Sequence, residues 1–156
     1  MKLYGRKKLS GIVAKLKKSG KKIVFTNGCF DLIHAGHIKV FEKAKALGDI
    51  LIVGLNSDSS VKRLKGPNRP LVNEKSRAYV ISALESVDYV ALFSEETPAQ
   101  LIAQLKPDIL VKGGDYRINE IVGRQDVKKV VRVPLLEGYS TTELIKKIVK
   151  SYGRCK

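Results

Sequence analysis

KIVFTNGCFDLIHAGHIKV, residues 22–40, is the stretch that decides the fold. Its apolar residues 23–25 predict a buried strand, and Asn27 with Gly28 predicts a tight turn because both residues tolerate unusual backbone angles. Apolar residues at helical spacing follow the sequence HAGH at 34–37. The stretch therefore predicts a strand, a loop and a helix, with two imidazoles three residues apart where the helix begins.

The start of this helix predicts an anion-binding site. The first backbone N–H groups of a helix have no partner within it, and the helix dipole places partial positive charge there. Gly36 would let a phosphate approach the backbone closely, and His34 and His37 would add side-chain donors. A single histidine beside apolar residues is usually packed in a core, but two histidines that bracket a glycine at a helix start favour a ligand site.

Size and composition indicate one domain over residues 1–156, with residues 1–20 forming a helix packed on it. The chain has 156 residues, of which 44% are hydrophobic, so it can bury a core. No apolar run approaches the ~20 residues of a membrane span, and the basic N-terminus lacks the apolar segment of a secretory signal. Cys29 and Cys155 lie far apart and suggest neither a disulfide framework nor a metal site. A cytoplasmic protein without a membrane partner is expected.

The balance of charge is strongly basic. Lys and Arg outnumber Asp and Glu by 30 to 15, which gives a net charge of +15. Such a field attracts nucleic acid or membrane surfaces, concentrates small phosphorylated substrates, or is simply a lysine-rich surface of the kind found in heat-adapted proteins. The basic residues are spread along the chain without an RGG tract or an aromatic RNA-binding pattern. Nucleic acid is therefore not expected as the biological partner.

Strand and helix patterns alternate along the chain. Gly48 is the expected C-cap of the helix that follows the HAGH sequence. Pro98 is the expected first residue of a helix that runs to about residue 105. Residues 144, 145, 148 and 149 are expected to form the apolar face of a closing helix. The alternation predicts an α/β fold, a Rossmann-like, right-handed, doubly wound parallel sheet of five strands with helices on both faces. Strands are expected at residues 23–25, 50–55, 89–93, 109–112 and 130–133. Helices are expected at 7–18, 36–47, from the cap at 56–58 to about 64, at 73–84, 98–105 and after 142.

Polar residues follow several strands, and ligands bind at the carboxyl ends of strands in an open parallel sheet. Asp58, after the second strand, is a candidate for the acceptor pocket, or it only caps the next helix. The second glycine turn, residues 113–116, would permit close ligand approach, and Asp115 could bind hydroxyls. Residues 140–142, Ser-Thr-Thr, form an ordinary N-cap and also offer a second helix N-terminus to phosphates.

A basic segment separates the second strand from the third. Residues 62–77, KRLKGPNRPLVNEKSR, are rich in Lys and Arg and contain two prolines and a glycine. This composition predicts a mobile basic loop that leads into a helix at about residue 73. Because the loop follows a strand end, it could fold over a bound triphosphate. A solvated charged surface explains it equally well, and both interpretations stay open.

The HxGH sequence after a strand resembles the nucleotidyltransferase superfamily. Four segments in order, TNGCFDLIHAGH, GLNSDSSVKRLKGPNRPLVNEKSR, ILVKGGDY and GYSTTELIKKI, resemble the adenylyltransferase domain of the bifunctional ADP-heptose synthase family over about residues 20–150. Glycerol-3-phosphate cytidylyltransferase is among that family's relatives. The resemblance implies transfer of AMP from ATP to D-glycero-β-D-manno-heptose 1-phosphate by direct in-line displacement, which gives ADP-heptose and pyrophosphate for lipopolysaccharide core or a similar surface glycan.

The resemblance also implies roles for single residues. His34 and His37 match the histidines that hold the transferring phosphate and, with Lys65, form the expected catalytic set; Lys62 is a further basic candidate. Cys29 stands where many relatives carry Thr, and a thiol is a poor hydrogen-bond donor. The other residues expected around the nucleotide are Thr26, Asn27, Gly28, Phe30, Gly36, Arg77, Gly113, Ser140, Thr141 and Thr142. Those expected around the sugar phosphate are Asp31, Asn56, Asp58, Lys112 and Asp115.

The cofactor and the partners follow from the same resemblance. The acceptor already carries a nucleophilic phosphate oxygen, so positioning and charge stabilisation suffice for catalysis. Mg²⁺ is expected, held largely by the triphosphate and water, and no carboxylate cluster stands out as its protein ligand set. The resemblance suggests a homodimer. The family joins a sugar kinase to the adenylyltransferase, and because no kinase segment is present here, a separate kinase is expected.

Two alternatives stay open beside this interpretation. One is a cytidylyltransferase that acts on glycerol 3-phosphate or a similar small phosphate, because a few backbone contacts decide the base. The other is a nucleotide- or RNA-binding module that keeps the fold without turnover, which the charge of +15 motivates. The two histidines together with the Ser-Thr-Thr sequence favour an enzyme over such a module.

Overall fold

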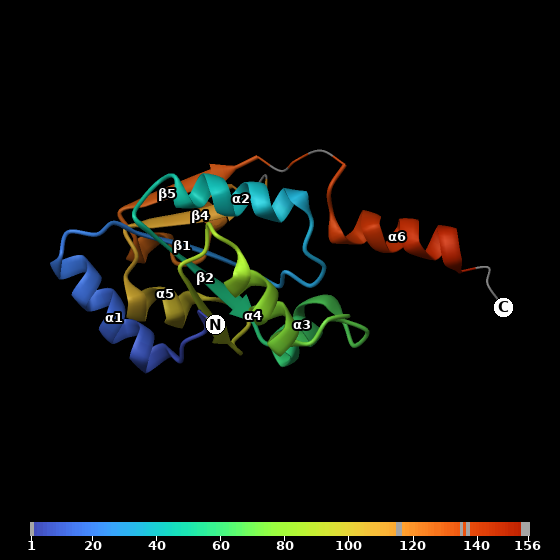
Figure 1. The fold of residues 1–156 in the computed structure, drawn as a ribbon, viewed down its shortest axis with the longest axis horizontal. Helices are drawn as coiled ribbons and strands as arrows, with labels where there is room; N and C mark the ends of the chain where they lie inside the picture. Colours follow the sequence, from blue (N-terminus) through green and yellow to red (C-terminus); the bar gives the residue numbers. More distant parts are fainter. Residues whose placement is uncertain (1, 115–116, 135, 137, 154–156) are drawn as a thin grey trace.

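A five-stranded parallel sheet forms the centre of the computed structural model, which describes residues 2–114, 117–134, 136 and 138–153 (Figure 1). Its strands lie in the order β3-β2-β1-β4-β5, and every neighbouring pair is parallel. The predicted doubly wound sheet is thereby confirmed. The strands are β1 (Ile23–Gly28), β2 (Ile50–Asn56), β3 (Tyr89–Phe93), β4 (Ile109–Gly113) and β5 (Lys129–Val133).

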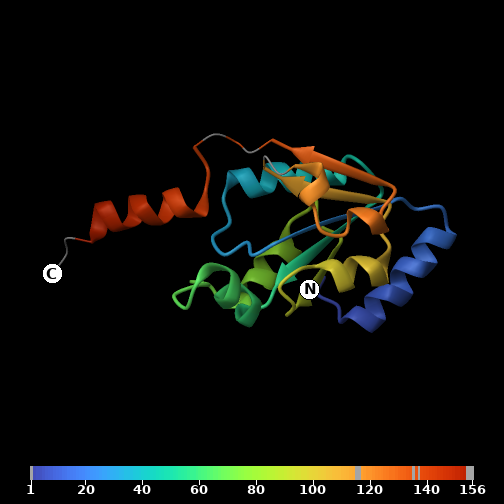
Figure 2. The same cartoon turned by 180° about the vertical axis from the view of Figure 1, so that it is seen from behind.

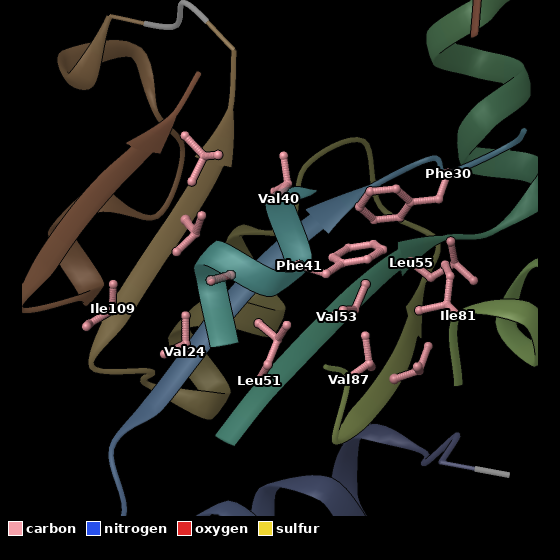
Figure 3. Packing of buried hydrophobic residues seen from close by; sticks show 14 of the residues in the cluster. Val24, Phe30, Val40, Phe41, Leu51, Val53, Leu55, Ile81, Val87 and Ile109 are labelled. Carbon is pink, nitrogen blue, oxygen red and sulfur yellow. The ribbon is translucent and has the colours of Figure 1, made fainter. Parts of the chain in front are cut away.

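Helices cover both faces of this sheet, as the alternating pattern predicts. Apolar residues of α2 and α4 pack on one face, where Phe41 and Ile81 meet the side chains of β2 (Figure 3). On the other face α1 packs beside α5 and buries Leu9 and Val13 (Figure 2). The helices are α1 (Arg6–Lys18), α2 (Ala35–Lys45), α3 (Asp58–Lys65), α4 (Glu74–Ala83), α5 (Ala99–Leu105) and α6 (Thr141–Tyr152), with short 3₁₀ helices η1 (Ile118–Glu120) and η2 (Arg124–Asp126).

The predicted turn at Asn27 and Gly28 is wrong. Both residues continue β1, and they pair with Gly54 and Leu55 of β2, because the adjacent strand supplies ladder partners for their backbone. The chain bends only afterwards, where Phe30 has a positive φ of 44°. A Cβ at Gly28 would lie 2.8 Å from the Phe30 ring, so the glycine makes room for this aromatic side chain.

Two predicted helix boundaries are also wrong by small margins. The helix α2 ends at Lys45 with Ala46 as its C-cap, so Gly48 does not cap it. A Cβ at Gly48 would lie 2.7 Å from Val24 and 2.9 Å from the carbonyl oxygen of Lys22, so this glycine permits close packing against β1. Pro98 is the N-cap of α5 and not its first residue.

The closing helix exists, but it does not close onto the sheet. The helix α6 extends away from the rest of the molecule in both views (Figures 1 and 2), and none of its residues is buried. Ile148 and Val149, predicted to form its packed apolar face, are 51% and 61% exposed. Across the described part of the chain, no helix has the length and apolar character needed to cross a membrane.

Candidate active site

A cleft of about 670 Å³ opens at the carboxyl ends of β1, β2 and β4. It therefore lies where the strand order switches between β1 and β4, the place at which open α/β sheets bind ligands. Most of the residues expected from sequence come together here: Thr26, Asn27, Gly28, Phe30, Asp31, His34, Gly36, His37, Asn56, Lys65, Lys112, Gly113, Thr141 and Thr142. Arg77, Asp58 and Ser140 are not among its lining residues, and Asp115 lies outside the described residues.

A second cleft shares one lining residue, Ile121, with this one. It measures about 560 Å³ and is formed by residues of η1, η2 and β5, including Arg124 and Lys128. Of the residues predicted to bind nucleotide or sugar phosphate, none that the structure describes lines it. The cleft at the strand ends is therefore the candidate active site.

The two histidines form a stacked pair at the start of α2. His34 is the N-cap of the helix, and its side chain makes no capping bond. The ring centroids of His34 and His37 lie 3.8 Å apart with an angle of 21° between the planes. The ring centroids of His37 and Phe30 lie 5.2 Å apart with an angle of 84° between the planes, and Phe30 in turn packs on Phe41 (Figure 3). The hydrophobic core thus fixes the orientation of the pair.

Both imidazoles have unused polar atoms. The Nδ1 atoms of His34 and His37 are buried and have no hydrogen-bond partner among the described residues. Burial lowers the pKa of both histidines, and the neighbouring His34 contributes to lowering the pKa of His37 to about 4. At neutral pH each ring is therefore uncharged and carries one N–H donor and one acceptor nitrogen. A buried polar atom without a partner costs free energy, which a phosphate ligand in the cleft would relieve.

Gly36, between the two histidines, keeps the cleft open. A Cβ at this position would lie 3.0 Å from Nδ1 of His34 and 3.3 Å from Cβ of Tyr139. A side chain here would therefore crowd the atom that has no partner. The prediction that Gly36 permits close approach of a ligand to this helix start agrees with this geometry.

Asp31 anchors the basic loop. Its buried carboxylate accepts hydrogen bonds from the backbone N–H groups of Leu71 and Val72, all at 2.9 Å, and from Nε of Arg69 at 2.7 Å. The segment between α3 and α4, predicted as a mobile loop, is therefore tied to the end of β1. Both carboxylate oxygens are engaged in this anchoring, and a contact of Asp31 with the sugar phosphate stays a prediction.

Arg77 is buried and its hydrogen bonds are made within the protein. Its side chain is 1% exposed. Nη1 donates to the carbonyl oxygens of Cys29 and Asn56, Nη2 donates to Asp58, and Nε donates to the carbonyl oxygen of Val72. The guanidinium thus joins α4 to the ends of β1 and β2 and is not presented to the cleft. The resemblance implies that Arg77 binds the triphosphate, but in this structure its guanidinium holds the protein framework together.

Asp58 and Asn56 also make internal contacts. Asp58 begins α3 and pairs with Arg77 at 2.7 Å, while Ser57 and not Asp58 is the N-cap. Asn56 is buried and donates from Nδ2 to Oγ of Ser60 at 2.9 Å, yet it remains part of the cleft wall. The predicted capping role of Asp58 is therefore wrong, and its carboxylate pairs with Arg77 outside the cleft lining, so a place in the acceptor pocket stays a prediction.

Lys112 provides a half-buried cation among the residues that line the cleft. It follows Val111, which pairs with Thr26, so it lies beside Asn27 across the strand switch. Its Nζ donates to Oδ1 of Asn27 at 2.5 Å. Burial lowers the pKa of Lys112 to about 8, because loss of water disfavours the charged form. An anion beside this ammonium would stabilise the charged form.

Cys29 and Lys65 also line the cleft. Cys29 is half-buried, and burial raises the pKa of its thiol, although the charges of Lys65 and Arg77 act in the opposite direction. The thiol is therefore protonated at neutral pH and offers only a weak donor. Lys65 is the last residue of α3 and is exposed at the cleft rim, so its ammonium is available to an anion.

The start of α6 contributes the opposite wall. Thr141 and Thr142 line the cleft, together with Tyr139, whose ring lies 6.3 Å from that of His34. Ser140 is the N-cap, and its hydroxyl oxygen accepts from the N–H of Glu143 at 3.1 Å. The segment therefore serves as a helix cap and as a wall of the cleft. Ser140 forms the cap, and Thr141 and Thr142 line the cleft.

Sequence reasoning missed Arg69 and Tyr139 as cleft residues. Arg69 belongs to the basic segment 62–77, and Tyr139 directly precedes Ser140. Neither position carries a local pattern that would predict a side chain facing the cleft. Which arginine of the loop faces inward depends on the anchoring by Asp31, a contact between residues 38 positions apart. In the described part of the chain, no three His, Cys, Asp or Glu side chains gather as metal ligands.

Comparisons with known proteins place this geometry in context. Residues 25–147 match the model of the cytidylyltransferase-like family. The bifunctional protein HldE of Geobacter sulfurreducens is 51% identical over 149 residues, and that of Helicobacter pylori G27 is 56% identical over 143 residues. These alignments cover 93% and 92% of this chain but 30% and 31% of the relatives. The chain thus spans about a third of the length of the curated relatives it matches.

Two solved structures are similar as well. The lipopolysaccharide core biosynthesis protein from Thermoplasma volcanium has 31% sequence identity and a TM-score of 0.66, covering 76% of this chain and all of that one. The pantoate-beta-alanine ligase of Francisella tularensis has 19% identity and a TM-score of 0.62, covering 96% of this chain and 78% of that one. The second likeness concerns the fold alone. Both agree with the predicted Rossmann-like architecture.

Proposed function

This chain belongs to the cytidylyltransferase-like family, and we propose that it transfers AMP from ATP to D-glycero-β-D-manno-heptose 1-phosphate, giving ADP-heptose and pyrophosphate. The observation that carries the proposal is the stacked pair of uncharged histidines whose Nδ1 atoms have no partner among the described residues. The identity of the sugar and of the base is supported by the four segments that resemble ADP-heptose synthases and by the similarity to HldE proteins.

The chemistry requires few groups from the protein. An oxygen of the sugar phosphate attacks the α-phosphorus of ATP, a new P–O bond forms, and the bond to the leaving pyrophosphate breaks with its electron pair on pyrophosphate. The attacking oxygen is already anionic, so no general base is needed. His34 and His37 hydrogen-bond the transferring phosphate, and Lys65 with Lys112 offsets the charge of the triphosphate and the acceptor.

Mg²⁺ is part of this proposal, as the ion that accompanies the triphosphate. Glu96 and Glu120 line the cleft, whereas the carboxylate of Asp31 is engaged by the loop. Such a donor set fits an ion that is bound mainly by phosphate oxygens and water, the usual mode for Mg²⁺ in nucleotide sites. When bound, the ion supplies neutralisation of charge on the phosphates.

The proposed partners follow from the reaction. A sugar kinase must supply the 1-phosphate, and ATP as donor supports a cytoplasmic location.

A homodimer is proposed because the apolar residues of α6 are exposed, including Ile148 and Tyr152 at 51% and 71%. Light scattering on the full chain at micromolar concentration tests the homodimer, and a mass of one chain alone would reject it.

Pyrophosphate release tests the proposed reaction. The chain is incubated with Mg²⁺ and each pairing of ATP or CTP with heptose 1-phosphate or glycerol 3-phosphate. ATP with heptose 1-phosphate should be the fastest pair. A faster reaction of CTP with glycerol 3-phosphate would replace the proposal with the alternative acceptor and base. No release with any pair, combined with salt-sensitive RNA binding, would instead support the non-catalytic module.

A further inference from the structure

We propose that Arg69, held in place by Asp31, is the arginine that binds a substrate phosphate in this cleft, and that Arg77 instead positions the framework around it. The ligand group is a phosphate, either of the triphosphate or of the sugar 1-phosphate. This inference rests on the proposed function for the identity of the substrates. It requires of the cleft itself only that it binds a phosphorylated ligand.

The environment of Arg69 differs from that of a buried structural arginine. Its side chain lines the cleft and is 22% exposed, whereas the side chain of its partner Asp31 is 1% exposed. Only Nε of its guanidinium makes a hydrogen bond with the described residues, to Asp31 Oδ2 at 2.7 Å. The two Nη groups therefore keep their donors available. A guanidinium with free Nη groups at a cleft wall matches the bidentate geometry that phosphate accepts.

The anchoring by Asp31 preorganises Arg69 for binding a phosphate. The same carboxylate accepts from the backbone N–H groups of Leu71 and Val72, so it fixes the loop and the side chain together. An arginine whose orientation is already set loses less conformational entropy when it binds. Asp31 also keeps one edge of the guanidinium occupied, which leaves the other edge for a ligand.

Arg77 provides the internal contrast. It lies eight positions further along the chain on α4, is 1% exposed and donates four hydrogen bonds to protein oxygens. Two of these join the carbonyl oxygens of Cys29 and Asn56, at the ends of adjacent strands. Arg69 therefore has both Nη groups available and access to the cleft, whereas Arg77 uses four of its five N–H donors within the protein and is not among the cleft residues.

The test compares Arg69→Gln with Arg69→Lys and with the control Lys75→Gln, all in the full chain. Lys75 is exposed on α4 and is not among the cleft residues, so its change removes one charge without touching the site. The measurements are the Kd for ATP by calorimetry, the KM for heptose 1-phosphate, and the melting temperature. Arg69→Gln should weaken binding of one phosphorylated ligand by about 10- to 100-fold, as expected for hydrogen bonds to a charged group, while Lys75→Gln stays near the parent value.

Each result assigns or rejects the role. A raised Kd for ATP identifies the triphosphate as the ligand, and a raised KM for heptose 1-phosphate alone identifies the acceptor phosphate. A smaller loss in Arg69→Lys than in Arg69→Gln supports the same conclusion, because lysine keeps the charge without the fork. Unchanged binding of both ligands in folded Arg69→Gln and Arg69→Lys would overturn it. If the parent protein shows no turnover, the proposed function fails, but the ATP titrations still decide whether Arg69 binds a phosphate.

Discussion

Two helix N-termini line the same cleft, and they are held in different ways. The helix α2 carries the histidine pair, and its residues Val40, Phe41 and Ala44 are buried in the core (Figure 3). The helix α6 carries Thr141 and Thr142, and none of its residues is buried. The histidine wall of the site is thus stabilised by folding of the sheet. The Ser-Thr-Thr wall depends on a helix whose own apolar side chains contribute little to that core.

The largest expected effect concerns the packing of α2. Phe41→Ala should lower the free energy of unfolding by about 3–5 kcal/mol, since it removes a fully buried aromatic ring and leaves a cavity. Ile148→Ala on α6, where the side chain is 51% exposed, should change it by less than about 0.5 kcal/mol. Urea titrations of both variants measure the difference. Equal losses would mean that α6 is packed as firmly as α2.

The next effect is on turnover and belongs to the α2 wall. His34→Ala and His37→Ala should each lower kcat by roughly 10²–10³-fold, the usual loss for one preorganised donor in the transition state. The Kd for ATP and the melting temperature should change much less. Histidines that serve only packing would give the reverse pattern, with a lower melting temperature and preserved activity per folded molecule. Near-normal kcat in both variants would rule out the mechanism proposed above.

Arg77 should affect stability more than ligand binding. Arg77→Ala leaves the carbonyl oxygens of Cys29 and Asn56 without their buried donor, so we expect a loss of about 2–3 kcal/mol in the free energy of unfolding. Where the variant stays folded at low temperature, its Kd for ATP should remain within a few-fold of the parent value. A stable Arg77→Ala protein that no longer binds ATP would restore the role that the family resemblance implies. Lys75→Ala, on the same helix and exposed, is the matched control.

The pH dependence of stability reports on the burial of the α2 histidines. The pKa of His37 is lowered to about 4 in the folded protein, from about 6.5 in an unfolded chain. Between these values the unfolded state binds more protons, so stability is complete above about pH 6.5 and falls as the pH drops toward 4. The loss should reach about 2 kcal/mol, less than the full shift implies because the ring is partly accessible to water. Thermal melts of the parent and His37→Gln from pH 7 to pH 4.5 should show a shallower slope in the variant, and parallel slopes would contradict the assignment.

The sequence predicts the part of the site that local patterns encode. The apolar runs give the strands, the HxGH spacing gives the paired imidazoles at a helix start, and residues 140–142 give the second N-terminus, all of which the structure contains. The turn predicted at Asn27 and Gly28 is wrong because turn propensity ignores the partners that β2 supplies to the end of β1.

What the sequence does not predict are choices between similar side chains. Arg69 and Arg77 belong to the same basic segment, and only the long-range contacts with Asp31 and Cys29 decide which one faces the cleft. In the same way, the apolar positions of α6 indicate an amphipathic helix but not the surface that it would cover. Local patterns specify which elements form, whereas contacts between distant residues specify which polar groups remain available to a ligand.

The smallest expected effect lies at the N-cap of α6. Ser140 Oγ accepts from the N–H of Glu143 at 3.1 Å, and Ser57 Oγ accepts from the N–H of Ser60 at 3.2 Å in the same way at the start of α3. Loss of either hydroxyl should cost its helix about 1 kcal/mol. The two helices differ in packing, since α3 buries Ser60 and Val61 and α6 buries nothing.

This difference should determine where the cost appears. Ser57→Ala should lower the global free energy of unfolding by about 1 kcal/mol, because α3 unfolds with the sheet. Ser140→Ala should leave global stability unchanged and raise amide exchange within α6 by about 5-fold, because a helix without core contacts opens on its own. The KM for ATP should change little, because a helix that opens only rarely still holds Thr141 and Thr142 at the cleft for most of the time. A global loss in Ser140→Ala equal to that in Ser57→Ala would show that α6 unfolds together with the sheet.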